Sequence, residues 1–236
     1  MKILVVNDDG IEAVGIKKLA NTAKQFGKVF VVAPEGQCSA MSHKITLTEN
    51  LKVKFIENYD VQGVHAYSVS GTPADCVKAA VECILDERPD IVFSGINKGY
   101  NAGAEIVYSG TVAAAMEGLL KGIPAIAFSV DCNDIYDVVD EYLSQVIKDV
   151  LSKDISKSEI WNINFPGCSK NELKGIEYGV IPAKTQYYVD DYHFYNENKS
   201  EIQPVGVRIK KAEEGSDLCA LINNYIAIGK VRSMVL

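Results

Sequence analysis

The sequence predicts an α/β fold with a doubly wound, mostly parallel sheet of the Rossmann type and a β-rich C-terminal extension. One observation is that short apolar, β-branched runs alternate with segments in which apolar residues recur at helical spacing. Another is that these runs are apolar at consecutive positions, which indicates strands buried on both faces and covered by helices. The alternation stops near residue 152, where shorter strands and long loops begin.

Glycine and proline set the ends of the first expected elements. A buried strand covers 2–6, and a helix with apolar residues at helical spacing runs from Ile16 to Gly27. The next buried strand, 28–33, stops at Pro34. Three more amphipathic strands are expected after a polar loop, at 45–48, 51–56 and 64–70.

The middle of the chain continues the alternation. Thr72 is a good N-cap and Pro73 a good first helical residue, so a helix is expected from Pro73 to about Glu87. Then follow in order a strand over 90–93, a helix over 111–120 closed by Gly122, a strand over 124–129 and a helix over 136–151.

The chain of 236 residues is expected to form one domain, with a Rossmann-like core over 1–152 and a β-rich extension over 153–236. No linker rich in Gly, Ser or Pro separates the two parts. The extension contains short strands and a tyrosine-rich stretch, TQYYVDDYHFY, and is expected to make oligomer contacts.

Charge and composition exclude several classes of function. A formal net charge of -7 argues against binding to a nucleic-acid polymer. No signal peptide or membrane-spanning stretch is expected, so neither export nor membrane partners are predicted. The six cysteines form no CxxC pair and are expected to be reduced thiols of a cytoplasmic protein, at positions 38, 76, 83, 132, 168 and 219.

Polar residues gather in loops that follow three of the expected strands, at 7–10, 35–43 and 94–110. Ligands of open parallel sheets bind beyond the carboxyl ends of the strands. Asp8 and Asp9 would point to opposite faces of a continuing strand, but a turn at Gly10 lets both reach one point. Two converging carboxylates repel each other unless a cation lies between them.

The oxygen-rich loops favour one kind of cation. Carboxylates together with a hydroxyl and an amide oxygen from the other loops suit Mg²⁺ or Mn²⁺. A zinc site would more often use histidine or cysteine, and the loops offer only His43 and Cys38. The sequence therefore predicts one divalent Mg²⁺ or Mn²⁺ ion.

The third loop ends in a possible anion site. Ser109, Gly110 and Thr111 open the expected helix, whose free N–H groups and dipole suit a phosphate. Together with the nearby Asn101 they are predicted to bind substrate. His43 and His193 are candidate acids, and Asp8 or Asp9 is the candidate to accept a proton in a catalytic step.

Plainer interpretations remain open for each motif. Asp8 and Asp9 could form a solvated turn, and Ser39 could cap a local turn. Asn97 and Asn101 lie next to glycines and could be left-handed turn residues.

Two other protein classes lack support in the sequence. A response-regulator receiver needs a phosphoacceptor aspartate at the end of its third strand, where this chain has Ser94 and Gly95. A dinucleotide-binding oxidoreductase needs GxGxxG after the first strand, and none is present there.

Several motifs in order along the chain resemble the survival protein E (SurE) family of 5′-nucleotidases. They read ILVVNDDG, VVAPEGQCSAMSHKITL, GTPADCV, PDIVFSGINKGYNAG, VYSGTVAAAMEGLLKGIPAIAFS and EGSDLCALINNYIAI. Departures are Cys38 and Ala40, where many members carry Arg and Gly, and Ile228-Gly229-Lys230 in place of a Thr-Pro-Leu ending.

The resemblance implies a metal-dependent phosphomonoesterase that hydrolyses nucleoside 5′-monophosphates, with some members accepting 3′-nucleotides or short polyphosphate. It implies one metal ion bound by Asp8, Asp9, Ser39 and Asn97. It also implies a homodimer or homotetramer with exchanged C-terminal segments. The alternative is a receiver-like or passive nucleotide-binding protein without hydrolysis.

Overall fold

The computed structural model describes residues 1–154, 156–233 and 235. Its centre is a nine-stranded sheet in the order β3-β4-β2-β1-β5-β6-β7-β11-β8. All neighbouring strands from β4 to β7 are parallel, whereas β3 and β11 pair antiparallel with β4 and β7. The strands are β1 (Lys2–Val6), β2 (Lys28–Pro34), β3 (Val53–Ile56), β4 (His65–Val69), β5 (Ile91–Lys98), β6 (Ala125–Val130), β7 (Glu159–Phe165), β8 (Gly175–Val180) and β11 (Tyr225–Arg232).

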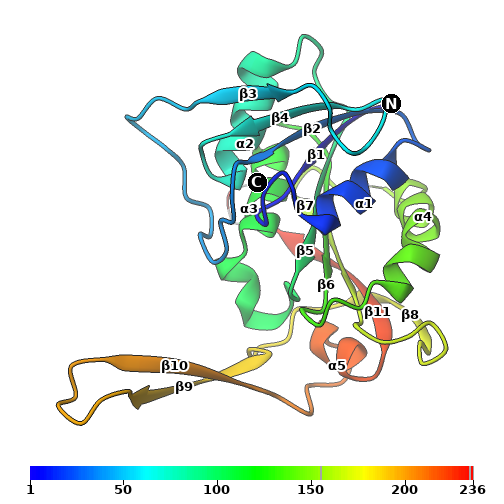
Figure 1. Ribbon diagram of the computed structural model, residues 1–236. Helices are drawn as coiled ribbons and strands as arrows, with labels where there is room; N and C mark the ends of the chain where they lie inside the picture. The colour runs from blue at the N-terminus through cyan, green and yellow to red at the C-terminus, as the bar shows by residue number, and fades with distance from the viewer. Residues whose placement is uncertain (155, 234, 236) are drawn as a thin grey trace.

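Helices cover both faces of this sheet, as Figure 1 shows. Residues of α1 (Val14–Ala23) and α4 (Asp137–Leu151) pack in one apolar cluster, and residues of α2 (Pro73–Ala79) and α3 (Gly110–Leu120) in another. Alternate residues of β1 enter the two clusters, and Ile3 to Val6 are all fully buried. The strand is apolar throughout because both of its faces are covered, which confirms the predicted fold class.

The order of the strands places a ligand site next to β1. β1 pairs with β2 on one side and with β5 on the other, with Leu4 opposite both Phe30 and Val92. The chain first adds strands on the β2 side and then continues on the β5 side. Ligands bind at such a switch point, beyond the carboxyl ends of the strands. The loops that follow β1, β2 and β5 therefore meet there.

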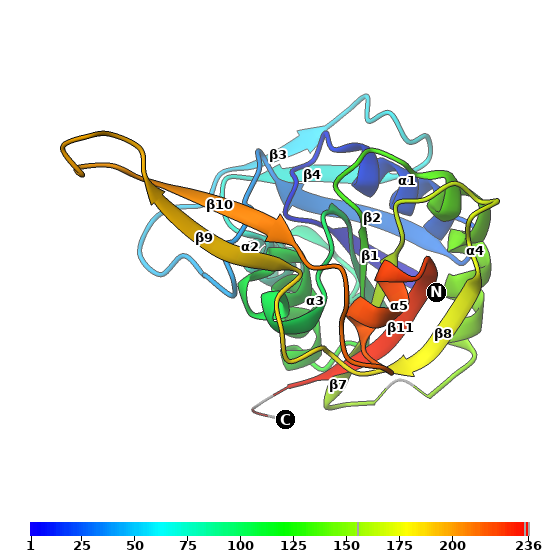
Figure 2. The same ribbon diagram turned by 90° about the horizontal axis from the view of Figure 1, so that it is seen from below.

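The C-terminal segment is β-rich, as predicted, and most of it extends the main sheet through β7, β11 and β8. A separate hairpin of β9 (Tyr188–Phe194) and β10 (Ile202–Arg208) extends away from the body of the molecule (Figures 1 and 2). The short helix α5 (Asp217–Ile222) was not expected; it begins where Ser216 Oγ accepts a hydrogen bond from Cys219 N.

The structure differs from expectation most clearly at 45–48, which is not a strand. Its neighbourhood bonds to the N-terminus of α2 instead: Thr46 N donates to Asp75 Oδ1 at 2.9 Å, and Thr72 Oγ1 donates to Lys44 O at 2.6 Å. Backbone groups held in this way cannot join a ladder.

Two element boundaries also differ. The helix that begins at Pro73 is α-helical only to Ala79 and continues as a wider π-helical turn, η1 (Ala80–Ile84). The strand expected over 90–93 continues as β5 to Lys98. Within the described part of the chain, no helix has the length and apolar character required to span a membrane.

Candidate functional site

A cavity of about 320 Å³ lies where the loops after β1, β2 and β5 meet the start of α3. Five of the predicted site residues line it: Asp8, Ser39, Asn97, Asn101 and Ser109. The convergence of the three loops is therefore observed, although these residues are far apart in the sequence.

Asp8 is only 3 % exposed and is held from α3. Its Oδ1 accepts a hydrogen bond from Thr111 Oγ1 at 2.5 Å, and its Oδ2 accepts one from Thr111 N at 3.1 Å. Burial raises the pKa of Asp8 to about 6, against the lowering effect of the Thr111 hydroxyl and with a further increase from the charge of Asp9. A solvated turn, the plainer interpretation, is excluded for Asp8.

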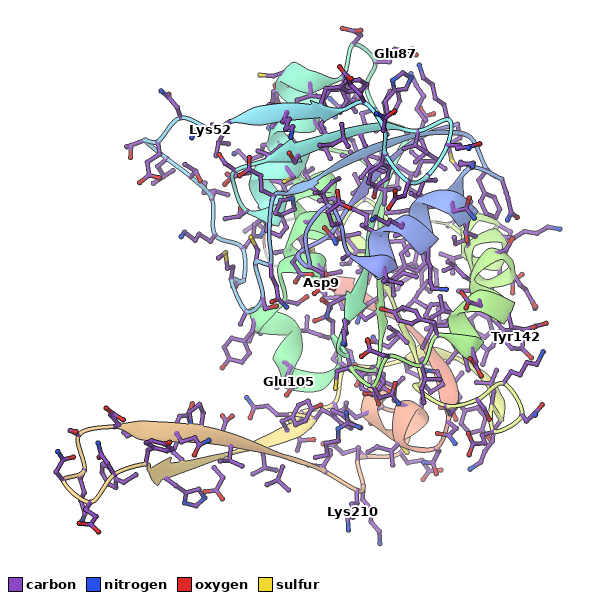
Figure 3. The ribbon with its side chains drawn as sticks, viewed as in Figure 1. Asp9, Lys52, Glu87, Glu105, Tyr142 and Lys210 are labelled. Carbon is purple, nitrogen blue, oxygen red and sulfur yellow. The ribbon has the colours of Figure 1, made fainter. Side chains whose placement is uncertain are left out.

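Asp9 is next to this cavity but is not among the residues that line it. Its Oδ2 accepts a hydrogen bond from Lys98 N at 2.9 Å, so the first loop is tied to the end of β5. Partial burial raises the pKa of Asp9, and the Lys98 and Gln37 hydrogen bonds lower it in part. In Figure 3 the labelled Asp9 lies at the end of the sheet that faces the hairpin.

Asn97 and Ser39 both present oxygen atoms suited to a cation. Asn97 Nδ2 donates to Gly99 O at 2.8 Å, and no described residue donates a hydrogen bond to Asn97 Oδ1. Ser39 is exposed and its hydroxyl makes no hydrogen bond with the described residues. Neither Asn97 nor Asn101 has a positive φ angle, so the left-handed turn interpretation is wrong for both.

Asn101 is fixed by a buried polar network on β6 and β7. Its N–H donates to Asn164 Oδ1 at 2.9 Å and its Nδ2 donates to Ser129 Oγ at 2.8 Å. Its carbonyl oxygen accepts hydrogen bonds from the side-chain amides of Asn162 and Asn164. The position of Asn101 in the cavity wall is therefore set by neighbouring strands.

The hydrogen-bonding groups at the start of α3 are largely paired with other groups of the protein. Ser109 Oγ accepts a hydrogen bond from Val112 N at 3.0 Å, which is an N-cap, and both donors of Thr111 bind Asp8. Thr111 is fully buried and does not line the cavity. Thr111 therefore donates its hydrogen bonds to Asp8 and not to a bound phosphate.

Gly110 explains how α3 can approach Asp8 so closely. A Cβ atom at Gly110 would lie 2.9 Å from both Cβ and Oδ2 of Asp8. Only glycine leaves room for this approach without a shift of the helix or the carboxylate.

The candidate proton donor His43 lies outside this cavity. Its Nε2 lies 3.0 Å from Glu117 Oε2, and its ring lines a neighbouring, mainly apolar cavity along α3. His43 therefore does not line the cavity of Asp8 and Asn97, although Ser109 lines both cavities.

The donor atoms fit a hard divalent cation. The candidate ligands are oxygen atoms from three loops, two of them carboxylates whose charges repel each other. In the ranges that the structure describes, no group of three or more His, Cys, Asp and Glu side chains could hold a metal. Mg²⁺ and Mn²⁺ accept carboxylate, hydroxyl and amide oxygens, whereas zinc would need a softer set.

Sequence reasoning missed a second group of residues that line the cavity. Three tyrosines and a glutamate are among the other residues of its wall, namely Tyr100, Glu105, Tyr108 and Tyr188. Glu105 and Tyr108 belong to a 3₁₀ helix, η2 (Gly103–Tyr108), and Tyr188 begins β9. The tyrosine-rich stretch that contains Tyr188 is a visible signal, although the sequence alone predicts only oligomer contacts for it.

Comparison with known proteins shows the family of this chain. The family model described as Survival protein SurE matches residues 3–188. A protein named 5′-nucleotidase SurE from Thermoanaerobacter sp. (strain X514) is 40 % identical over 232 residues, which cover 97 % of this chain and 90 % of the relative. One of the same name from Clostridium botulinum (strain ATCC 19397 / Type A) is 37 % identical over 240 residues, covering 97 % and 91 %.

A solved structure gives the same result for the fold. The crystal structure of SurE protein from Aquifex aeolicus superposes with a TM-score of 0.84 at 34 % identity, covering 100 % of this chain and 95 % of that one. Since the family model spans most of the chain and the relatives match nearly all of it, this chain belongs to the Survival protein SurE family.

Proposed function

We propose that this protein is a metal-dependent 5′-nucleotidase, which hydrolyses nucleoside 5′-monophosphates to nucleoside and phosphate. Relatives that match nearly the whole chain bear the name 5′-nucleotidase SurE. The observation that carries the proposal is the buried carboxylate of Asp8, which lines one cavity with the oxygen atoms of Asn97 and Ser39 beside the start of α3.

Asp8, Asp9, Ser39 and Asn97 would hold one Mg²⁺ or Mn²⁺ ion. When bound, the ion supplies Lewis acidity toward the phosphoryl oxygens. The carboxylates of Asp8 and Asp9 offset the charge of the ion, which favours their ionised forms. Thr111 acts on Asp8 by two hydrogen bonds, so we assign it an orienting role in place of the predicted contact with substrate.

The phosphate is proposed to lie against Ser109, Gly110 and Asn101. The Ser109 hydroxyl can donate to a phosphoryl oxygen while its own oxygen caps α3, and the helix dipole favours negative charge there. Water attacks the phosphorus atom, the bond to the 5′ oxygen breaks, and Asp8 or Asp9 accepts the proton of the water. The departing 5′ oxygen takes a proton from solvent water and becomes the nucleoside hydroxyl.

The hairpin supports a homodimer or homotetramer. β9 and β10 are exposed along most of their length, and their large apolar side chains include Phe194 and Ile202, which are 55 % and 59 % exposed. A two-stranded hairpin with exposed apolar residues is marginally stable alone and suits a protein interface. All six cysteines are free thiols, which supports a cytoplasmic location.

Phosphate release from a panel of nucleoside 5′- and 3′-monophosphates and short polyphosphate tests the proposal. With Mn²⁺ present, we expect the 5′-monophosphates to be hydrolysed, and EDTA to abolish the activity until Mn²⁺ or Mg²⁺ is restored. Asp9→Asn should lower the activity sharply without unfolding the protein. Nucleotide binding without any phosphate release would instead identify a passive nucleotide-binding protein.

A further inference from the structure

The cavity has an aromatic part that the proposed metal and phosphate residues do not use. Tyr100, Tyr108 and Tyr188 contribute to its wall together with Glu105. Tyr188 comes from the base of the hairpin, far in the sequence from the loops that carry the aspartates. This part of the wall offers flat aromatic surface beside one carboxylate.

Tyr188 is held in place by a stack of rings. The ring of Tyr187 lies 5.2 Å from that of Tyr100 and 5.1 Å from that of Tyr188, with both pairs edge to face. Aromatic pairs prefer this arrangement. The stack connects the loop after β5 to the start of β9, so it fixes the hairpin base against the cavity.

Polar contacts fix the other end of Tyr188. Arg208 Nε donates to the Tyr188 hydroxyl at 3.1 Å, and Arg208 Nη2 also bonds to Asp131 Oδ1 at 2.9 Å. The N–H of Tyr188 donates to Glu105 Oε1 at 3.1 Å. A side chain that is already ordered loses little conformational entropy when a ligand binds to it.

The charge of Glu105 decides which end of a nucleotide this region suits. A carboxylate beside the ring repels a phosphate, whereas Lys98, the start of α3 at Ser109 and the proposed cation ligands line other parts of the same cavity. In Figure 3 the labelled Glu105 lies between Asp9 and the hairpin. The uncharged nucleoside is therefore the part of the substrate that fits beside Glu105 and Tyr188.

We propose that Tyr188 is the surface on which the nucleobase of the substrate stacks, with Arg208 and the Tyr100–Tyr187 pair as its support. The inference rests on the proposed function and adds a residue that determines preference for nucleotides over other phosphomonoesters. Bases stack on tyrosine without regard to their hydrogen-bonding edges. The protein should therefore favour nucleotides strongly over base-free phosphates and discriminate weakly between bases.

Steady-state hydrolysis by Tyr188→Leu tests this inference with two substrates, a nucleoside 5′-monophosphate and ribose 5-phosphate, which lacks the base. Loss of base stacking should raise KM for the nucleotide about 5- to 100-fold, with kcat nearly unchanged because the base is bound equally before and during reaction. Both constants for ribose 5-phosphate should stay within about twofold of the wild-type values.

Two further variants control for other effects of the substitution. Tyr188→Phe keeps the ring and should retain a nucleotide KM within about threefold of the wild type. Tyr178→Leu makes the same change on β8, an edge strand of the main sheet, at a residue that is 46 % exposed, and should leave both substrates unaffected. Melting temperatures show whether each variant is folded.

The possible outcomes separate the inference from the proposed function. Equal losses on both substrates, or no loss on the nucleotide, would overturn the role of Tyr188 while leaving the phosphatase intact. If the wild type hydrolyses neither substrate, the proposed function fails. Calorimetric titration with adenosine still tests Tyr188 in that case: wild type and Tyr188→Phe should bind it, and equal binding by Tyr188→Leu would refute the inference.

Discussion

Thr111 gives both of its hydrogen-bond donors to the carboxylate of Asp8, the hydroxyl at 2.5 Å and the N–H at 3.1 Å. The contact joins residues 103 positions apart and places the start of α3 directly on the loop that follows β1. It also favours the ionised form of a carboxylate whose burial works in the opposite direction. We infer that this pair prepares Asp8 for a cation, which leads to the first prediction.

Replacing Thr111 by Val should weaken metal binding without unfolding the protein. The variant keeps a side chain of similar shape but loses the hydroxyl bond, and a hydrogen bond to a charged group contributes about 1.5–3 kcal/mol. The Mn²⁺ concentration for half-maximal activity should rise about tenfold or more. Thr111→Ser retains the hydroxyl and serves as the control. An unchanged Mn²⁺ dependence in Thr111→Val would contradict the orienting role.

Asp8→Asn should stabilise the metal-free protein at pH 7. Burial, aided by the charge of Asp9, raises the pKa of Asp8 from 3.8 to about 6. The folded state therefore binds a proton more tightly than the unfolded state, and ionisation of Asp8 lowers the stability progressively between pH 3.8 and about 6 and fully above that range. The gain in the free energy of unfolding should be on the order of 1–3 kcal/mol at pH 7.

Denaturant unfolding at pH 7 and pH 4.5 measures this effect. The stability difference between wild type and Asp8→Asn should shrink as the pH falls through 6, because Asp8 then becomes neutral in the folded wild type. Mn²⁺ should raise the melting temperature of the wild type but not of Asp8→Asn. If Asp8→Asn were less stable than the metal-free wild type at pH 7, the claim that the ionised Asp8 carboxylate lowers the stability of the folded protein would be refuted.

Gly110→Ala should reduce activity while the protein remains folded. The added methyl group would lie 2.9 Å from Asp8 Oδ2, so α3 or the carboxylate must shift. A displacement of this kind at a catalytic group commonly costs about 100-fold in rate. Gly36→Ala is a matched control, because its Cβ atom meets nothing within 4 Å. Comparable kcat/KM values for both variants would disprove the close packing.

Asp75→Asn should loosen the loop that carries Ser39. Burial raises the pKa of Asp75, but hydrogen bonds from Thr46 and Thr72 outweigh it, so the pKa is lowered overall. This stabilisation is present above the unfolded-state value near 4 and disappears as the pH falls through the lower folded-state value. The substitution should cost about 1–3 kcal/mol at pH 7, measured by thermal unfolding.

The pH dependence provides the check on that prediction. As the pH falls from about 4 through the lower folded-state pKa of Asp75, the wild type loses the same contribution, so the two proteins should converge in stability. Thr46→Val removes only the hydroxyl bond at 2.7 Å and should cost less than Asp75→Asn. A difference that persists unchanged at pH 3 would show that the Asp75 charge does not stabilise the loop.

Local chemistry explains which elements could be predicted. The start of α2 was predicted from Thr72 and Pro73, and Thr72 does cap that helix together with Asp75. Residues 45–48 do not form the expected strand because Thr46 donates a hydrogen bond to Asp75, a residue 29 positions away. No local pattern of apolar residues reports a partner at that distance.

The amino-acid sequence alone determined the α/β class, the loops at the carboxyl ends of the strands and the oxygen-rich residues in them. These features follow from hydrophobic period and turn chemistry, which act over a few neighbouring residues. Only the tertiary structure decided that Thr111 donates a hydrogen bond to Asp8 and that His43 contacts Glu117. It also decided that Tyr188 lines the cavity from the hairpin. Each depends on strand order and helix packing, which bring together segments that share no local signal.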